Sequence, residues 1–353
     1  MPELIWQEPG NPGRKVTRAD YPSDTTRALL AQTIWGSRAT RYRIIDIEAK
    51  LARLRVPSFF VLSEGDEELC VFVLDRCQKR VARQLCDGFH FVMASTVPHR
   101  QNEGLAGVLV DLVREYCVSA ITPPGFGFAY VEETTEFSLR LSDQIGHDSE
   151  AHLPLTLFTR FFPRADPHAT ALRPDEGDTL RAALGTFYVD HQLTDFATSL
   201  KQDECFVIRD AGGKIVAAVQ AEVLRWSVMS MPGIQGKFLL KVLPHLPGLN
   251  RLLVLQDLRI VRFSNLFISV GYENRCLALL EDCLYRHQAR IGLFLLDERS
   301  RVLTQLRHIG RLGILSRATS GSAKLRLSTV GMDADMVAQL REGPVLMSAA
   351  DVF

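Results

Sequence analysis

The sequence lacks several features that would assign the protein directly to a class. Its seven cysteines form no CxxC pair, so the spacing predicts reduced, buried thiols rather than disulfides or a metal site. No apolar run reaches the roughly 18 residues that a membrane-spanning helix needs. The first residues, MPELIWQEPGNPGRK, lack the apolar core of a signal peptide. We therefore expect a cytoplasmic protein that holds no metal and has no membrane partner.

The chain also lacks an excess of charge of either sign. Lys and Arg total 41, and Asp and Glu also total 41, so the formal net charge is +0. This balance gives no argument for binding nucleic acid or an anionic membrane surface, and we predict no nucleic acid partner. With 353 residues, 46% of them hydrophobic, the chain is long enough for two domains with packed cores.

The predicted helices and strands occur in the same order twice, as helix, helix, hairpin, strand, helix, strand, helix and strand. We therefore predict a first domain over residues 1–164, a linker over residues 165–178 and a second domain over residues 179–353. The linker assignment rests on a tract rich in Pro and Asp. Sequence identity between the halves is low, so the duplication rests on element order alone.

Local patterns give more detail in the first half. Residues 1–20, rich in Pro and Gly, are predicted to be irregular. Residues 40–56, TRYRIIDIEAKLARLRV, are predicted to form a helix that ends before Pro57. Residues 78–88, QKRVARQLCDG, are predicted to connect two strands.

The stretch STVPHRQNEGLAGVLVDLV, residues 95–113, joins a predicted strand to a predicted helix through Gly104. A glycine lets the backbone approach a ligand closely. The free N–H groups of the first helical turn attract an anion. The turn therefore predicts a pyrophosphate site. The alternative is a glycine that serves only the tight packing of the strand–helix turn.

This turn resembles the signature of the GCN5-related N-acetyltransferase (GNAT) superfamily. That signature is Arg or Gln, two residues, Gly, one residue, then Gly or Ala, after a strand that ends in Val. Here Val97, Gln101, Gly104 and Ala106 hold these positions, and LSDQIGH, residues 141–147, resembles the helix motif LYEKLGF. The resemblance implies an α/β (α+β) fold of two tandem domains. Each has a mixed, mostly antiparallel sheet that is splayed at a V and flanked by helices.

The resemblance also implies a function and a cofactor. It points to an acyl-CoA-dependent N-acyltransferase, most simply one that transfers acetyl from acetyl-CoA to a primary amine by direct attack. The pantetheine arm would lie between the strand FHFVMASTV and its neighbour FGFAYVEE. The implied coenzyme-binding residues are Val97, Gln101, Asn102, Glu103, Gly104, Leu105, Ala106 and Gly107.

The catalytic residues depart from the family's pattern. The helix tyrosine that often protonates the leaving thiolate is Ser142 here, and a hydroxyl of this kind is a poor acid that donates at best through water. His90 is the first candidate for the base, because His titrates near neutral pH, and Glu132 is the next. The alternatives are a structural histidine and a solvated strand end.

The acceptor is predicted to be a small-molecule amine or an amino-acid-like molecule. Trp35, Arg38 and Tyr42 cluster in IWGSRATRYR and are predicted to bind it, unless the two aromatic residues only anchor helix packing. The matching turn of the second half, FISVGYENRCLALL, lacks the Gly-x-Gly/Ala step, so we predict a degenerate second site. The insertion KFLLKVLPHLPGLNRLLVL, residues 237–255, is predicted to cover the groove between the halves or to form a homodimer contact.

Two other functions are compatible with the same sequence. The missing tyrosine favours a non-catalytic acyl-CoA sensor or scaffold. The basic run Arg76, Lys79, Arg80 and Arg83 is either an ordinary solvated surface or the docking face of an acyltransferase that uses an acyl-carrier protein or a longer acyl donor. Release of free CoA in the presence of an amine separates the enzyme from the sensor.

Overall fold

The structure is a computed structural model that describes residues 2–36, 40–231, 254–317, 321–348 and 351 of the chain. Its strands are β1 (Glu3–Glu8), β2 (Asn11–Ala19), β3 (Arg41–Ile44), β4 (Pro57–Glu64), β5 (Glu67–Val81), β6 (Gln84–Thr96), β7 (Gly125–Glu132), β8 (Ser149–Thr159), β9 (Ala169–Ala171), β10 (Cys205–Arg209), β11 (Ile215–Ser230), β12 (Leu258–Ile268), β13 (Ile291–Leu295) and β14 (Ser322–Val330). Its α-helices are α1 (Asp24–Gln32), α2 (Ile47–Leu51), α3 (Leu105–Ala120), α4 (Glu136–Ile145), α5 (Gly177–Phe187), α6 (Phe196–Ser199), α8 (Glu273–Arg286), α9 (Arg301–Ile309) and α10 (Ala334–Glu342).

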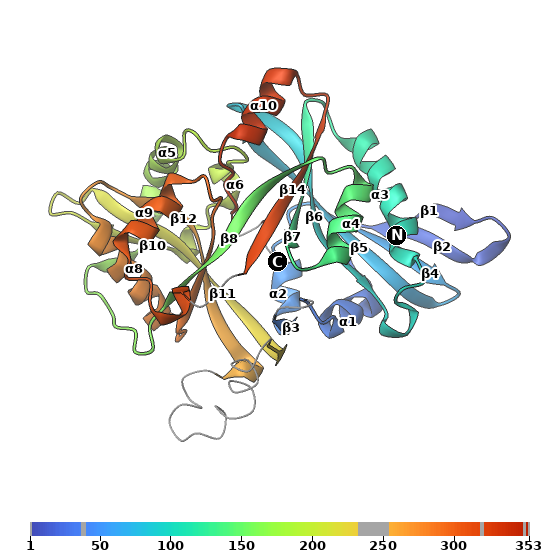
Figure 1. The fold of residues 1–353 in the computed structure, drawn as a ribbon, viewed down its shortest axis with the longest axis horizontal. Helices are drawn as coiled ribbons and strands as arrows, with labels where there is room; N and C mark the ends of the chain where they lie inside the picture. The colour runs from blue at the N-terminus through green and yellow to red at the C-terminus, as the bar shows by residue number, and fades with distance from the viewer. Residues whose placement is uncertain (1, 37–39, 232–253, 318–320, 349–350, 352–353) are drawn as a thin grey trace.

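One continuous sheet crosses the molecule, with helices packed on its faces (Figure 1). The strand order is β1-β2-β4-β5-β6-β7-β14-β8-β13-β12-β11-β10-β9, and β3 pairs with β11. Neighbours are antiparallel except β6 with β7 and β12 with β13, which are parallel. The mixed, mostly antiparallel α/β architecture predicted from the sequence is therefore confirmed.

The two parts of the chain exchange strands at the centre of this sheet. β14, from the C-terminal part, lies between β7 and β8, where Leu325 pairs with Tyr130 on one side and Ala151 on the other. β8, from the N-terminal part, in turn pairs with β13. The ladders that hold this centre together therefore join residues far apart in the sequence.

The parallel strands β6 and β7 form a wedge. They pair from Asp87 with Gly125 as far as Phe91 with Ala129. Beyond that rung both strands continue, and no further pairing joins them in the described chain. β6 is bulged at this point: Phe91 pairs with Leu74 and Met93 with Val73, which leaves Val92 as the extra residue. The splayed V that the resemblance implied is present.

Separate hydrophobic clusters cover the two faces of the sheet around the wedge. On one face α3 and α4 lie side by side, and α3 buries Leu109 and Val113 against strand residues such as Phe89. On the other face α1 and α2 bury Leu30 and Ile47. The wedge can therefore be approached from two differently lined sides.

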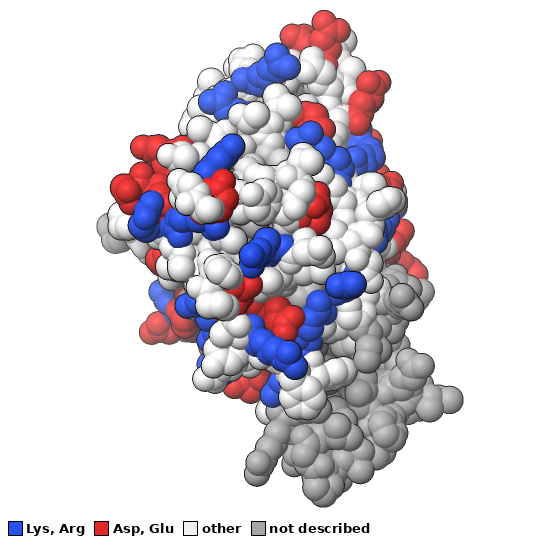
Figure 2. Space-filling view, turned by 90° about the vertical axis from the view of Figure 1, so that its left-hand side faces the viewer, with Lys and Arg blue, Asp and Glu red and all other residues white. Residues whose placement is uncertain are grey.

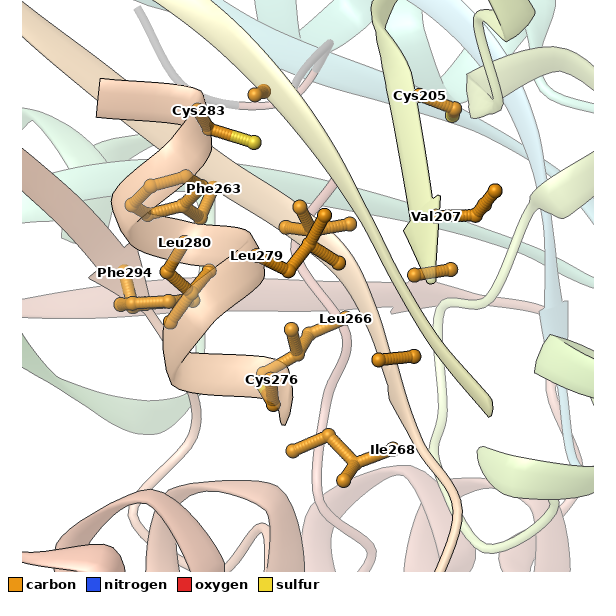
Figure 3. Close-up of a cluster of buried hydrophobic side chains, with 14 of the residues drawn as sticks. Cys205, Val207, Phe263, Leu266, Ile268, Cys276, Leu279, Leu280, Cys283 and Phe294 are labelled. Atoms are coloured by element: carbon orange, nitrogen blue, oxygen red, sulfur yellow. The ribbon is translucent and has the colours of Figure 1, made fainter. Parts of the chain in front are cut away.

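The second part of the chain has its own core, built around α8 (Figure 3). Leu279 and Cys283 point from α8 toward the side where Val207 of β10 lies, while Leu280 lies beside Phe294 of β13. The pairing of β12 with β13 ends at Phe263 with Phe294, while β12 continues to Ile268. β13 ends at Leu295, one residue after that pair, so β12 extends past the end of its neighbour.

Three local predictions are wrong, each because a pairing partner is not visible in the local pattern. Residues 1–20 contain the hairpin β1–β2 rather than irregular structure. Residues 40–56 contain the strand β3 before the short helix α2, because β3 pairs with the distant β11. Residues 78–88 continue the ladder β5–β6 around Ala82 and Arg83, which both have positive φ. The linker tract contains the strand β9, and α10 was not predicted.

The predicted state of the cysteines is confirmed, because all seven are free and buried. Among the described residues, no helix is long and apolar enough to cross a membrane, and no group of three or more His, Cys, Asp or Glu is arranged to hold a metal. Figure 2 views the end of the molecule that lies at the left of Figure 1, where cationic and anionic side chains are interspersed. The insertion, residues 237–255, lies almost entirely outside the described residues.

Candidate active site

The turn before α3 has the backbone conformation that an anion site requires. Asn102 and Gly104 have φ of 70° and 78°, and Gly104 is the N-cap of α3. No side chain of the described residues caps this helix, and Gln101 to Gly104 are exposed. A Cβ at Gly104 would meet nothing within 4 Å, so the positive φ, rather than crowding, explains the glycine. The N–H group of Gly107 donates to the carbonyl of Gly104 at 2.9 Å, so the first-turn N–H groups that a ligand can use are those of Leu105 and Ala106.

An arginine braces this turn and offsets its acidic residue. Arg100 pairs with Glu103 at 2.7 Å and with Glu64 at the end of β4 at 3.0 Å. These hydrogen bonds raise the pKa of Arg100, and the one from Arg100 lowers the pKa of Glu64. Without Arg100, the Glu103 carboxylate would repel an anion at the helix start.

A groove of about 410 Å³ continues from this turn between α3 and α4. Its lining residues are Gly107, Asp111, Arg114, Asp143 and Gln144. Gly107 is the third residue of α3, so the groove begins in the first turn of the helix.

Ser142 lies on α4 on the same face of the sheet. Its side chain is buried, and its Oγ lies 2.8 Å from Nδ1 of His147. Burial lowers the pKa of His147 to about 3, helped by the positive charge of Arg326. The serine therefore contacts an imidazole rather than solvent.

His90 lies on the opposite face of β6. Its ring stacks on Phe128 with centroids 4.6 Å apart and is 1% exposed. Burial lowers its pKa to about 3, and its Nδ1 has no hydrogen-bond partner among the described residues. A histidine with this pKa is a weak base at neutral pH, so its environment resembles that of a structural residue.

Glu132, at the end of β7, is partly buried, and burial raises its pKa. It lies on the same side of β7 as Tyr130, two residues before it. Burial raises the pKa of Tyr42 well above its ordinary value, and electrostatic interactions with Glu132 and Tyr130 add to the effect. The structure therefore brings together Tyr42, Tyr130 and Glu132, the first and last of which the sequence had singled out.

The predicted aromatic pair of the acceptor site, Trp35 and Tyr42, does not lie at a junction of two helices. The two residues face each other in an antiparallel bridge at the strand β3. Tyr42 is on β3, exchanges backbone hydrogen bonds of 2.8 and 3.0 Å with Trp35, and stacks on Trp226 of β11 at 4.1 Å. The Nε1 of Trp35 is buried without a partner among the described residues. Arg38 lies outside the described residues.

Sequence reasoning missed a network of buried ion pairs on this face. Glu222 of β11 pairs with Lys50 and Arg53, both at 3.1 Å, and with Arg262. Desolvation lowers the pKa of Lys50 to about 7. The signal in the sequence was weak: Glu222 and Arg262 are charged residues inside strands, which is also typical of solvated strand faces.

A second part of this network lies near His90. Asp351 pairs with Lys79 at 2.7 Å and with Arg55 at 3.0 Å. Lys79 is 1% exposed and Arg76 pairs with Asp87. The basic run around Lys79 is therefore not one continuous surface patch.

The matching turn in the second half differs in its electrostatics. Gly271 has φ of 84° and Tyr272 is the N-cap of α8. The amide of Gly271 donates a hydrogen bond of 3.2 Å to the Glu273 carboxylate. At this turn a carboxylate of the chain itself accepts from the backbone, whereas the turn at Gly104 has its acidic residue paired with Arg100; the degenerate second site stays a prediction.

Comparisons with solved structures agree with this geometry. A crystal structure of Saccharomyces cerevisiae N-myristoyltransferase with bound myristoyl-CoA has a TM-score of 0.61 over 97% of this chain and 91% of its own, at 10% identity. A second, with myristoyl-CoA and inhibitors, has a TM-score of 0.63 over 97% of this chain and 88% of its own, at 9% identity. The chain has the tandem GNAT fold.

Other comparisons are less informative. A GCN5-related N-acetyltransferase from Sphaerobacter thermophilus matches 81% of this chain and 87% of its own at 14% identity, with a TM-score of 0.47. No protein-family model and no curated protein matches the sequence.

Proposed function

We propose that this tandem GNAT-fold chain is an acyl-CoA-dependent N-acyltransferase with its donor site in the first half. One observation carries the proposal: the uncapped, positive-φ turn of Gly104 lies beside the open wedge between β6 and β7. Solved structures of the same fold contain myristoyl-CoA, which supports an acyl-CoA as the cosubstrate. The pyrophosphate would accept hydrogen bonds from amides of residues 101–106, since that of Gly107 donates to Gly104.

The chemistry we propose is direct attack. The amine nitrogen forms a bond to the thioester carbon, the C–S bond breaks, and sulfur leaves with the electron pair. The proton lost by the amine goes to Glu132, whose raised pKa makes it a better base than an ordinary carboxylate. Most of the rate would come from holding amine and thioester together. Tyr42 and Trp35 would line the acceptor site, for a primary amine.

For the donor we propose a short acyl group, most simply acetyl. The face of the sheet under α3 is packed with aromatic side chains, including Phe72 and Phe91, whose rings meet edge to face at 6.1 Å. A long acyl chain that entered under α3 would have to displace them, which costs packing energy.

A non-catalytic acyl-CoA sensor is the second candidate function. The contact of the Ser142 hydroxyl with His147, instead of with open solvent, favours it. Release of free CoA when acetyl-CoA is incubated with a panel of primary amines would exclude it.

The test is isothermal titration of acetyl-CoA into the wild type, Gly104→Trp and Gly271→Trp. The two glycines make a matched pair, because both have positive φ and open space around a Cβ. We expect one submillimolar site that is lost in Gly104→Trp and kept in Gly271→Trp. Absence of binding to the wild type, or loss of binding in Gly271→Trp alone, would refute the proposed site. Myristoyl-CoA titrated in parallel tests the chain length: binding as tight as that of acetyl-CoA would contradict a short acyl donor.

A further inference from the structure

His147, which directly follows α4 and its C-cap Gly146, contains a buried ring nitrogen that lacks a partner. The residue is 3% exposed. Its Nδ1 is 2.8 Å from the hydroxyl of Ser142, whereas its Nε2 has no hydrogen-bond partner among the described residues. A buried polar atom in this state costs about 1–3 kcal/mol. Such an atom calls for a ligand or water that satisfies it.

The unpartnered nitrogen lies beside Gly127 of β7, near the closed end of the wedge. A Cβ at Gly127 would be 2.8 Å from Oγ of Ser328 on β14, 3.0 Å from the ring of Phe91 and 3.7 Å from Nε2. The rings of Phe91 and His147 meet edge to face at 5.0 Å. The pair Phe91–Ala129 is the last rung that joins β6 to β7. Gly127 itself pairs with Phe89, so the nitrogen lies over the closed end of the wedge, next to that last rung.

Hydrogen bonding decides the tautomer of this ring. Burial lowers the pKa of His147 to about 3, so the ring is neutral at pH 7. If Nδ1 carried the proton, both the Ser142 hydroxyl hydrogen and the Nε2 lone pair would be left unsatisfied. If the Ser142 hydroxyl donates to Nδ1, the Nε2–H group is the one group of this pair left without a hydrogen-bond partner. The second arrangement leaves fewer unpaired groups and is therefore the stable one.

We propose that the Nε2–H group of His147 donates a hydrogen bond to the sulfur of the bound coenzyme, and that Ser142 is a positioning residue that holds this tautomer. The proposal rests on the proposed donor site in the wedge. The hydrogen bond stabilises negative charge on sulfur as the C–S bond breaks. The imidazole keeps its proton, and solvent protonates the thiolate after release.

Ser142 and His147 both fall within the stretch that resembles the family's helix motif. Ser142 stands where the motif LYEKLGF has its tyrosine, and His147 stands where it has its phenylalanine. The small serine cannot itself extend toward the wedge, while the ring of His147 lies against Gly127. The imidazole of His147 thus places a polar group beside Gly127, although the tyrosine of the motif is missing.

The test compares the binding of CoA with that of desulfo-CoA, which lacks the sulfur. Both are titrated into the wild type, His147→Phe, Ser142→Ala and the surface control Arg140→Ala. The sulfur of free CoA is a neutral thiol at pH 7, and a neutral hydrogen bond is worth roughly 0.5–1.5 kcal/mol, so we expect wild type and Arg140→Ala to prefer CoA by about 2–12-fold. We expect the preference to vanish in His147→Phe and to fall in Ser142→Ala. The affinity for desulfo-CoA should stay the same in all four proteins, which also verifies folding.

The outcomes separate the inference from the proposed function. If the wild type binds both ligands equally, or if His147→Phe keeps the preference, the contact with sulfur is refuted while the donor site stands. If the wild type binds neither ligand, the proposed function fails and the inference fails with it.

Discussion

The buried carboxylate of Asp351 should contribute strongly to stability. It is fully buried and accepts hydrogen bonds from Lys79 at 2.7 Å, from Arg55 at 3.0 Å, and from the amide and hydroxyl of Ser348 at 2.9 and 2.6 Å. Lys79 is 1% exposed, so its ammonium group has almost no access to water. The ion pair holds the C-terminal end of the chain against β5.

We expect Asp351→Asn to lower the free energy of unfolding by about 3–5 kcal/mol, because it leaves the Lys79 ammonium group buried without a counter-charge. That is a large part of the roughly 5–15 kcal/mol that stabilises a typical protein. Adding Lys79→Met should restore part of the loss, because the double variant buries no unpaired charge. If the double variant is more stable than Asp351→Asn, the loss comes from the unpaired charge; if it is less stable, the loss comes from poorer packing.

The assay is urea unfolding at pH 7 for the two single variants, the double variant and Asp66→Asn, a substitution at an exposed turn residue. The coupling energy between positions 79 and 351 is read from the double-mutant cycle. A loss below 1 kcal/mol in Asp351→Asn, or a double variant no more stable than the single ones, would refute the reasoning.

Two further predictions concern titratable groups. Glu132→Gln should lower kcat/KM by about 10²–10⁴-fold while leaving acetyl-CoA affinity unchanged. In the wild type kcat/KM should fall as the pH drops through the raised pKa of Glu132, because only the carboxylate accepts a proton; an unchanged rate in the variant would contradict this role. His90, whose folded pKa is lowered to about 3, should reduce stability as the pH falls from its unfolded pKa near 6.5 toward 3, because the unfolded chain binds the proton. Replacing it by Phe should remove about 2 kcal/mol from the loss of stability between pH 7.5 and pH 5, measured by urea unfolding at both pH values; an identical pH dependence would show that His90 is not buried as a neutral ring.

Local sequence determined the features that depend on neighbouring residues. The turn at Gly104 could be located because positive φ, an uncapped helix start and a preceding strand all leave local marks. The helices α3, α4 and α8 could be predicted for the same reason, since apolar periodicity is a property of adjacent turns. The wedge was expected only through resemblance to a family.

Tertiary structure alone decided everything that depends on pairing across the chain. β14 lies between β7 and β8, and β3 lies beside β11, because hydrogen bonds and apolar burial join segments whose separation no local pattern records. The same folding buries Lys79 against Asp351 and brings Tyr42 to Glu132. It also places the Nε2 of His147 beside Gly127 of β7, which sequence spacing could not reveal, because the direction of a side chain depends on what packs around it.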